Sequence, residues 1–341
     1  MSRTRTRIGR AIIVAAVAAA GMTSARAQAP MTRMPAGYIG EQVPEDIVRM
    51  YERGQDWLVR AQAANGRWSN EDGEDGPAIQ GLSLLALIAE GTDPRYGRHA
   101  AAIRRGLDAL LGMQDAQGYF GPSMYHHGFA TLALAELYGM VDEPRLGPAL
   151  VRAVRLILEA QKHSRPGAWR YSPGSSDADT TVSGAQVVAL FAARNAGLEV
   201  PDEAIERALA FYRECQNPDG GIGYTERGEG SPPRNAIAVV VATLARERNS
   251  RLFRDAWAWL KRSGDNAQDS YYFYYLYYAA QAYFRADMNA WRTWNRQLAD
   301  RLSATQNASG GWDGPNGSTF CTATSLLSMA LNYRYLPIYE R

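Results

Sequence analysis

The stretch "GGWDGPNGSTFCTATSLLSMAL", residues 310–331, joins two predicted helices through a glycine-rich turn that carries a tryptophan. The first helix ends at Gln306, and the second begins around Ser318. Glycine allows backbone conformations closed to other residues, and a glutamine side chain can hydrogen-bond exposed backbone groups at helix ends. We therefore interpret this turn as a structural corner and not as a catalytic signature.

Similar turns recur along the chain. They read "QAANGRW" (62–68), "QDAQGYF" (114–120), "QKHSRPGAW" (161–169), "QNPDGGIGY" (216–224) and "QNASGGW" (306–312). Their glutamines are separated by 52, 47, 55 and 90 residues, and the last spacing is close to twice 45. One copy has therefore lost its turn signature, around residues 263–269. Self-similarity at a fixed period indicates a repeat architecture.

Each repeat contains two segments with apolar residues at helical spacing. The first segments run into the glutamines and cover roughly 46–62, 97–114, 145–161, 201–216, 250–262 and 289–306. The second segments follow the turns and cover roughly 77–90, 124–139, 180–196, 234–247, 271–286 and 318–335. The second set carries little charge around its circumference, which is typical of buried helices. We therefore expect an all-α fold without a sheet, with an inner ring of six helices inside an outer ring of six.

The N-terminus has the pattern of a secretory signal. "MSRTRTRIGR" (1–10) carries four arginines, "AIIVAAVAAAGM" (11–22) is apolar, and "ARA" (25–27) places small residues before a cleavage site. We expect a signal peptide over 1–27, a short N-terminal segment over 28–44 and a single toroid domain over 45–341. The signal predicts export to the periplasm or cell envelope of a bacterium.

Removal of the signal reverses the net charge of the chain. It takes away five of the 37 basic residues, which leaves 32 against 35 acidic residues, a net charge of −3. Nothing in this balance favours nucleic acid as a partner. No later stretch is long and apolar enough for a transmembrane helix. Cys215 and Cys321 could pair in an oxidising compartment, but the sequence does not place them together, and it leaves the oligomeric state open.

The Gln–(x)–Gly–(x)–Trp turns resemble the QW repeats of the squalene–hopene cyclase and protein prenyltransferase superfamily, over nearly all of residues 45–338. More specifically, the chain resembles an exported, single-toroid bacterial branch that carries prenyltransferase/squalene-oxidase repeats. The resemblance rests on "MYHHGFATLALAELYGM" (124–140), "DTTVSGAQVVALFAARNAGLEVP" (179–201), "YYFYYLYYAAQAYF" (271–284), "WRTWN" (291–295) and "YRYLPIYER" (333–341). The chain departs from the branch at Ala185, where the branch often has tryptophan. The resemblance implies an (α/α)6 toroid of six helical hairpins.

Polar and aromatic residues gather near the predicted starts of the inner helices. If these helices all run the same way, their N-termini converge on one mouth, the usual form of a pocket. The residues that we expect to contact a ligand there are Tyr125, His126, Gln186, Arg234, Asn235, Tyr271, Tyr274, Tyr275, Tyr278, Thr319 and Cys321. The candidate catalytic residues are Asp179, Asp177 and His127. The ligand is expected to be a small molecule or a lipid such as an isoprenoid.

The sequence "DADTT" (177–181) resembles the D-x-D-D motif of class II terpene cyclases, whose middle aspartate protonates an alkene. Asp177 and Asp179 match its first two aspartates, but Thr180 replaces the last. The resemblance makes Asp179 a candidate proton donor, which must be a neutral acid. The alternative interpretation is that Asp179 caps the helix beginning at Thr180. Capping and the helix dipole would then lower the pKa of Asp179.

Tyr271, Tyr274, Tyr275 and Tyr278 form one stripe at helical spacing. Such an aromatic wall could stabilise a carbocation through the ring quadrupoles. It could also hold sugar rings, with the hydroxyls as hydrogen-bond partners, or it could pack in the core with each hydroxyl satisfied.

Adjacent helical residues point about 100° apart, so at most one of His126 and His127 faces a given pocket. We favour His127, which matches the histidine of the resembling branch. Protein prenyltransferases hold zinc with Asp, Cys and His, which makes a site of His127, Asp179 and Cys321 conceivable. Their Asp-x-Cys pair is absent, because Thr319 stands two residues before Cys321. We therefore expect no metal and no cofactor.

Two further segments favour structural interpretations. "SNEDGEDG" (69–76) is acidic, but it lacks the ligand register of a calcium-binding EF-hand loop, and acids before a helix start are ordinary. "YRYLPIYER" (333–341) is predicted to tie the last helix back against the ring.

Three functions remain open from the sequence. The first is an enzyme that resembles terpene cyclases or prenyltransferases, with Asp179 as acid; full cyclases with this motif carry two toroids, and this chain has one. The second is a non-catalytic toroid that binds a lipid or glycan or acts as a scaffold. The third is a carbohydrate-active lyase using Tyr and His. A deep apolar cavity above Asp179 favours the first, and a shallow polar groove lined by Tyr, Arg and His favours a glycan.

Overall fold

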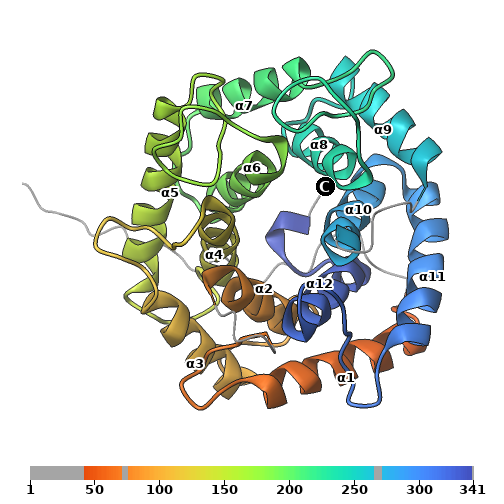
Figure 1. The fold of residues 1–341 in the computed structure, drawn as a ribbon. Helices are drawn as coiled ribbons and strands as arrows, with labels where there is room; N and C mark the ends of the chain where they lie inside the picture. The colour runs from red at the N-terminus through yellow and green to blue at the C-terminus, as the bar shows by residue number, and fades with distance from the viewer. Residues whose placement is uncertain (1–41, 71–75, 265–270, 340–341) are drawn as a thin grey trace, which may run out of the picture. The chain divides into compact units, whose positions relative to one another are not determined.

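A computed structural model describes residues 42–70, 76–264 and 271–339, all within one unit of contacts, Met34–Arg341. These ranges contain twelve α-helices and two short 3-10 helices (Figure 1). The α-helices are α1 (Glu45–Ala61), α2 (Pro77–Ile88), α3 (Ala100–Leu111), α4 (Met124–Leu137), α5 (Leu146–His163), α6 (Thr180–Asn195), α7 (Asp202–Glu214), α8 (Pro232–Leu244), α9 (Arg251–Ser263), α10 (Tyr272–Ala286), α11 (Met288–Thr305) and α12 (Ser318–Met329). The 3-10 helices are η2 (Ala330–Asn332) and η3 (Pro337–Tyr339).

The even-numbered helices form an inner ring, and the odd-numbered helices form an outer ring around it (Figure 1). Each inner helix packs against the next, and α12 packs against α2, which closes the ring. The only β pairing in the described residues is two isolated bridges, Tyr138 with Val141 and Gln216 with Ile222. The predicted all-α toroid is confirmed. The largest boundary error is in the last helix, which was expected to reach residue 335 but ends at Met329; the helix expected over 97–114 is also shorter, Ala100–Leu111.

The two rings differ in burial as their sequences predict. In α2 every residue except Ala78 is buried, whereas α9 buries one stripe from Leu252 to Leu260 and exposes its charged face. A helix that is apolar all round needs neighbours on every side, and an amphipathic helix needs them on one. Among the described residues no helix has both the length and the apolar character needed to cross a membrane.

The glutamine of each turn links neighbouring outer helices. Gln62 Nε2 donates to the carbonyl of Gly66 in its own turn, at 3.2 Å, and to the carbonyl of Ala102 in α3, at 2.9 Å. Gln114 and Gln161 repeat this pattern. In each pair, one bond goes to the glutamine's own turn and the other to a carbonyl in the next outer helix, so the glutamine ties its turn to the next hairpin.

The aromatic residue of the turn is held by two further bonds. Trp68 Nε1 donates to the Leu58 carbonyl at 2.8 Å, and the Trp68 backbone N–H donates to Gln80 Oε1 at 3.1 Å. In the other turns, the equivalent backbone N–H donates to an inner-helix side chain: Phe120 to His127, Trp169 to Ser183, Ile222 to Asn235 and Trp312 to Thr322. Each turn therefore needs a polar side chain near the start of its inner helix.

The last and first helical hairpins are joined by hydrogen bonds of the same kind. Gln306 Nε2 donates to the Met50 carbonyl in α1 at 2.9 Å, and Thr319 Oγ1 donates to the Ser69 carbonyl at 2.6 Å. The last hairpin thus contacts the first as any hairpin contacts the next. The ring is closed by hydrogen bonds as well as by packing.

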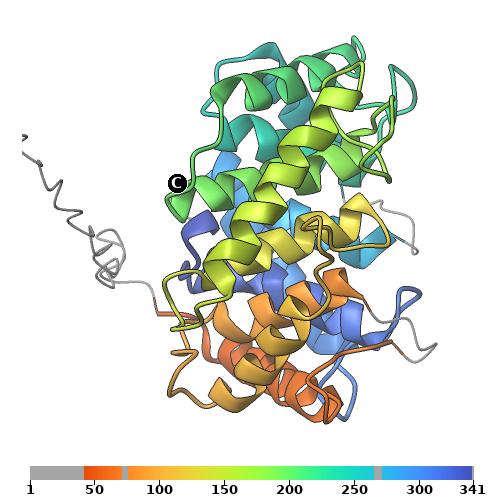
Figure 2. The same ribbon diagram turned by 90° about the vertical axis from the view of Figure 1, so that its left-hand side faces the viewer.

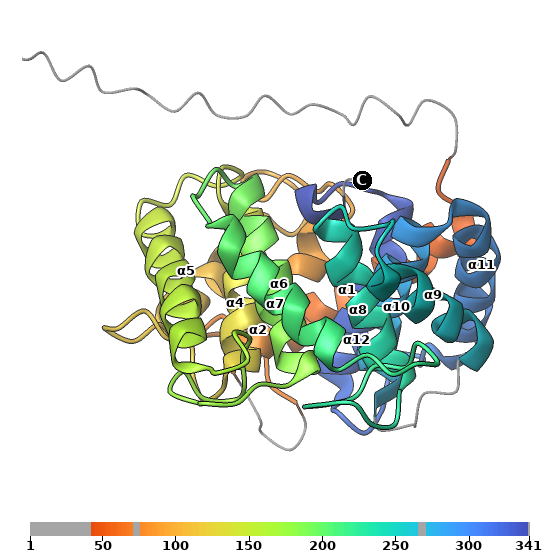
Figure 3. The same cartoon turned by 90° about the horizontal axis from the view of Figure 1, so that it is seen from above.

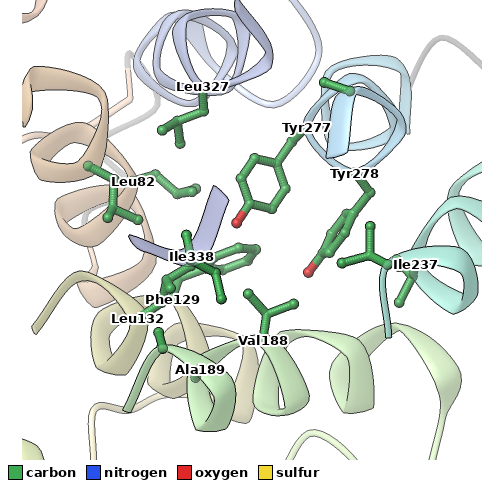
Figure 4. Packing of buried hydrophobic residues seen from close by; sticks show 14 of the residues in the cluster. Leu82, Phe129, Leu132, Val188, Ala189, Ile237, Tyr277, Tyr278, Leu327 and Ile338 are labelled. Atoms are coloured by element: carbon green, nitrogen blue, oxygen red, sulfur yellow. The ribbon is translucent and has the colours of Figure 1, made fainter. Parts of the chain in front are cut away.

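The C-terminal segment fills one end of the ring. Figures 2 and 3 place the end of the chain on the face opposite the outer-to-inner turns. Ile338 in η3 reaches the middle of the inner ring, where it lies among Phe129, Val188, Tyr277 and Tyr278 (Figure 4). Ile338 and Tyr339 are buried, and Arg285 donates to the Ile338 carbonyl. Of the segment 333–341 that was predicted to tie back against the ring, Leu336, Ile338 and Tyr339 are buried, and Ile338 lies inside the ring; residues 340–341 lie outside the described residues.

Candidate functional site

A cavity of about 650 Å³ opens at the N-terminal ends of the inner helices. We call it the cup. Its described lining is Asn70, Ala78, Ile79, Tyr125, His126, Phe129, Tyr171, Thr181, Tyr224, Ser231, Pro233, Arg234, Tyr271, Tyr274, Pro315, Asn316 and Phe320. All six inner helices contribute at least one residue from their first two turns. The inner helices therefore run the same way, and the predicted mouth exists.

Helix register decides which residues reach the cup. The second residue, the third or both line it in each inner helix, as Tyr125 and His126 do in α4. The fourth residue instead caps the turn, as Gln80, His127, Ser183 and Asn235 do. Five of the predicted residues consequently line the cup: Tyr125, His126, Arg234, Tyr271 and Tyr274.

His127 lies in the turn and not in the cup. Its Nδ1 accepts from the Phe120 N–H at 3.1 Å, and its Nε2 donates to the Ala153 carbonyl at 3.0 Å. This pairing fixes a neutral tautomer, and burial lowers the pKa of His127 from 6.5 to about 4. Asn235 caps another turn with the same pair of bonds, one accepted and one donated: its Oδ1 accepts from the Ile222 N–H, and its Nδ2 donates to the Gly220 carbonyl.

The remaining predicted contact residues lie behind the cup wall. Gln186 is fully buried, and its Nε2 donates to the Met124 carbonyl at 2.7 Å. Tyr275 and Tyr278 are fully buried in α10, and Tyr278 points toward the middle of the ring (Figure 4). Thr319 makes the ring-closing bond described above. Cys321 is buried in α12 and Cys215 at the end of α7, and the two are not joined by a disulfide.

Asp179 is the N-cap of α6 and is also buried. Its Oδ1 accepts from the N–H groups of Thr181 and Val182, at 2.9 and 2.8 Å, and from the Thr181 hydroxyl at 2.6 Å. Its Oδ2 has no hydrogen-bond partner among the described residues, and the Arg170 Nε lies 3.9 Å away. Burial raises the pKa of Asp179, although these hydrogen bonds and Arg170 oppose the shift. Its role as a helix cap was expected to lower the pKa of Asp179, but the desolvation of the buried carboxyl outweighs the capping hydrogen bonds and raises it.

Asp177 is exposed and lies 3.5 Å from Arg170 Nη1. The Arg170 guanidinium lies over the rings of Tyr171 and Tyr224, at 5.5 and 5.3 Å from their centroids. The hydroxyls of these two tyrosines are 2.6 Å apart. Arg170 thus holds both aspartates and supports two tyrosines of the cup wall from behind.

A hydrogen-bond chain connects the cup to Asp179. The Tyr125 hydroxyl donates to Thr181 Oγ1, and the Thr181 hydroxyl donates to Asp179 Oδ1. Burial, with the nearby Asp179 carboxyl, raises the pKa of Tyr125, so its hydroxyl stays protonated at neutral pH. The Tyr125 ring also meets the rings of Tyr171 and Tyr274, with centroids 5.8 and 6.3 Å apart. These contacts fix the aromatic wall in place.

The basic groups of the cup are anchored by neutral partners. Arg234 Nε donates to the Ile222 carbonyl at 2.9 Å, and its Nη2 donates to the Glu229 carbonyl. His126 Nδ1 lies 2.9 Å from Ser123 Oγ, and burial lowers the pKa of His126. Burial also lowers the pKa of Arg234.

Sequence reasoning missed part of the wall. Tyr171, Tyr224 and Asn70 each follow the inward residue of a turn (Trp169, Ile222 or Trp68) by two positions. Comparing turns in register could have found them. Residues 71–75 of the acidic stretch "SNEDGEDG" lie outside the described residues, as do 1–27 and part of the degenerate turn at 263–269. No group of His, Cys, Asp or Glu in the described ranges is arranged to hold a metal, and His127, Asp179 and Cys321 do not form such a group.

No protein-family model and no curated protein matches the sequence. Among solved structures, the alpha-1,6-mannanase GH76A of Salegentibacter sp. HEL1_6 is similar, with a TM-score of 0.65 and 11% identity over 85% of this chain and 99% of that one. The type II terpene cyclase MstE from Scytonema has a TM-score of 0.59 and 16% identity over 87% of this chain and 100% of that one. A protein from Actinoplanes has a TM-score of 0.57 and 17% identity over 84% of this chain and 99% of that one.

These likenesses show the α/α toroid fold, and at such low identity they show the fold alone. One neighbour is a mannanase and another is a terpene cyclase, so a toroid enzyme or binding protein fits both. The specific repeat family that the sequence resembles is not confirmed by them.

Proposed function

We propose that the protein is an exported glycan-binding toroid of the bacterial cell envelope, with the cup as its binding site. Tyr125, Tyr171, Tyr224, Tyr271 and Tyr274 supply aromatic faces from four parts of the chain. Aromatic rings with polar tips suit sugars, which present flat apolar faces and hydroxyl edges.

The observation that carries the proposal is the contrast between the cup and the ring centre. The cup is open and mixes tyrosines with Arg234, His126 and amide side chains. The centre is packed with Ile338, Tyr277, Tyr278 and aliphatic residues (Figure 4). A long isoprenoid would require a deep apolar cavity there, whereas a sugar chain needs only the surface cup.

Titration calorimetry of the purified protein against a panel of soluble oligosaccharides tests this proposal. We expect Tyr171→Ala to weaken binding about tenfold or more, because a ligand in the cup would cover the Tyr171 ring, which is 45% exposed in the free protein, and loss of an aromatic anchor of this kind costs over about 1 kcal/mol. Tyr96→Ala is the matched control, since Tyr96 is 85% exposed and outside the cup. Absence of binding to every oligosaccharide, or equal losses in both variants, would refute the proposal.

A second candidate is a terpene cyclase-like activity on an isoprenoid, and one observation favours it. Asp179 combines burial, a raised pKa and a carboxyl oxygen without a partner among the described residues. These features favour the neutral acid that alkene protonation needs. Thr181 lies between Asp179 and the cup, so a substrate would have to displace it.

Mass spectrometry of polyprenes incubated with the protein tests this candidate. Asp179→Asn keeps a good N-cap, so the fold should persist while cyclisation stops. Asp177→Asn is the control, because Asp177 is exposed. Cyclisation that survives Asp179→Asn would exclude Asp179 as the proton donor.

A further inference from the structure

We propose that the cup prefers sugars bearing a carboxylate, such as uronic acids, and that Arg234 recognises the carboxylate. This inference rests on the proposed glycan-binding function and names the ligand class of that site. It follows from the placement of charge around the cup.

The described lining contains cationic and neutral groups and no carboxylate. Arg234 and His126 are its basic residues, and burial raises the pKa of Tyr125, Tyr224 and Tyr274, so these three hydroxyls stay protonated. Asp179 lies behind Thr181, near Arg170. Glu229 acts on the charge of Arg234 from outside the lining but does not pair with it, so a neutral sugar would leave Arg234 without a carboxylate partner in the described cup.

Arg234 occupies a position that disfavours a cation in three ways. It is the third residue of α8, near the positive end of the helix dipole. It is half-buried, where charge is costly. It makes no ion pair with any described residue, and its anchors are the carbonyls of Ile222 and Glu229. A carboxylate from the ligand would relieve all three penalties.

The other inner helices reinforce the preference. First-turn residues of all six line the cup. The Asp179 carboxyl caps the start of α6, and among the described residues the other five inner helices begin without a carboxylate cap, so five positive helix ends point toward the cup. Backbone N–H groups at helix starts favour anions. The anchored guanidinium then supplies the directional contact, because its planar fork matches carboxylate geometry.

Calorimetry with an oligogalacturonate and its fully methyl-esterified form tests the inference, since esterification removes the negative charge from the same sugar chain; the salt dependence separates the loss of charge from the added methyl groups. We expect the acid to bind about tenfold more tightly than the ester, because a charge-assisted hydrogen bond is worth about 1.5–3 kcal/mol. This difference in affinity should shrink as salt is added, because salt screens the charges. Arg234→Gln should remove the preference, so that the acid and the ester bind with equal affinity to this variant. Arg227→Gln is the control, because Arg227 is exposed in the loop before α8 and lies outside the cup.

The outcomes separate the two claims. Equal binding of acid and ester overturns the carboxylate preference but leaves glycan binding intact. A preference that persists in Arg234→Gln, with an unchanged melting temperature, assigns the recognition elsewhere and overturns the role of Arg234. If no saccharide of either kind binds, the proposed function itself fails. Tight binding of inorganic phosphate without any saccharide would also count against a sugar carboxylate.

Discussion

Replacement of His127 by glutamine tests the turn architecture most sharply. Gln80 holds the same position in α2, where Oε1 accepts from the Trp68 N–H and Nε2 donates to the Gly106 carbonyl. His127 makes the matching bonds to Phe120 and Ala153. A glutamine at 127 can therefore satisfy both partners without a titratable group. At neutral pH we expect His127→Gln to fold normally.

The magnitude follows from the pKa of the imidazole. The pKa of His127 is lowered from 6.5 to about 4 because the buried ring cannot accept a charge. The unfolded chain binds this proton below about pH 6.5, and the folded chain only below about pH 4, so stability falls as pH falls through this window. The difference, at about 1.36 kcal/mol per pKa unit, is about 3 kcal/mol.

Reversible urea unfolding between about pH 7.5 and pH 4 measures the effect. The wild type should lose about 3 kcal/mol more unfolding free energy across this range than His127→Gln does. His163→Gln is the control and should track the wild type, because His163 is exposed at the end of α5. If His127→Gln loses stability in parallel with the wild type, His127 is not a buried neutral cap and the repeat register is wrong.

Three further changes follow from backbone and charge. Arg246 has a φ of 61° at the end of an inner helix, a position that Gly91, Gly139 and Gly197 occupy after other inner helices. Arg246→Gly should therefore raise the free energy of unfolding, measured with urea, by about 1 kcal/mol. Gly220→Ala should lower that free energy by about 2 kcal/mol or more, because φ is 91° and the new methyl would lie 2.3 Å from the Asp255 carbonyl oxygen; an unchanged melting curve would refute this. Asp179→Asn should remove a pH dependence of the free energy of unfolding, because burial raises the pKa of Asp179 in the folded chain. The wild type should become more stable relative to the variant as the pH falls through the interval just above 3.8. Urea titrations showing the opposite trend would contradict this.

The helices could be predicted from the sequence because apolar periodicity survives in both rings. The two sets differ in charge, which assigned them to inner and outer positions. The turn motif also fixed the number of hairpins, although one copy had lost its signature. These features are local, and local patterns are what a single sequence displays.

The site was only partly predictable, because the role of a residue depends on its exact position within the first turn of an inner helix. Tyr125 and His126 line the cup, whereas the next residue, His127, caps a turn. A shift of one residue along a helix start changes the role, and helix starts are the least certain boundaries in a sequence. Filling of the ring centre by Ile338 could not be foreseen, because no periodic pattern says where a short terminal segment packs.

The most direct test of the account is a crystal structure of the protein with the ligand that binds it best. We predict ligand density in the cup, against Tyr171, Tyr224 and Arg234, with Ile338 still packed in the ring centre. Density in the centre, with the 337–339 segment displaced and the cup empty, would contradict the account and favour a deep isoprenoid cavity.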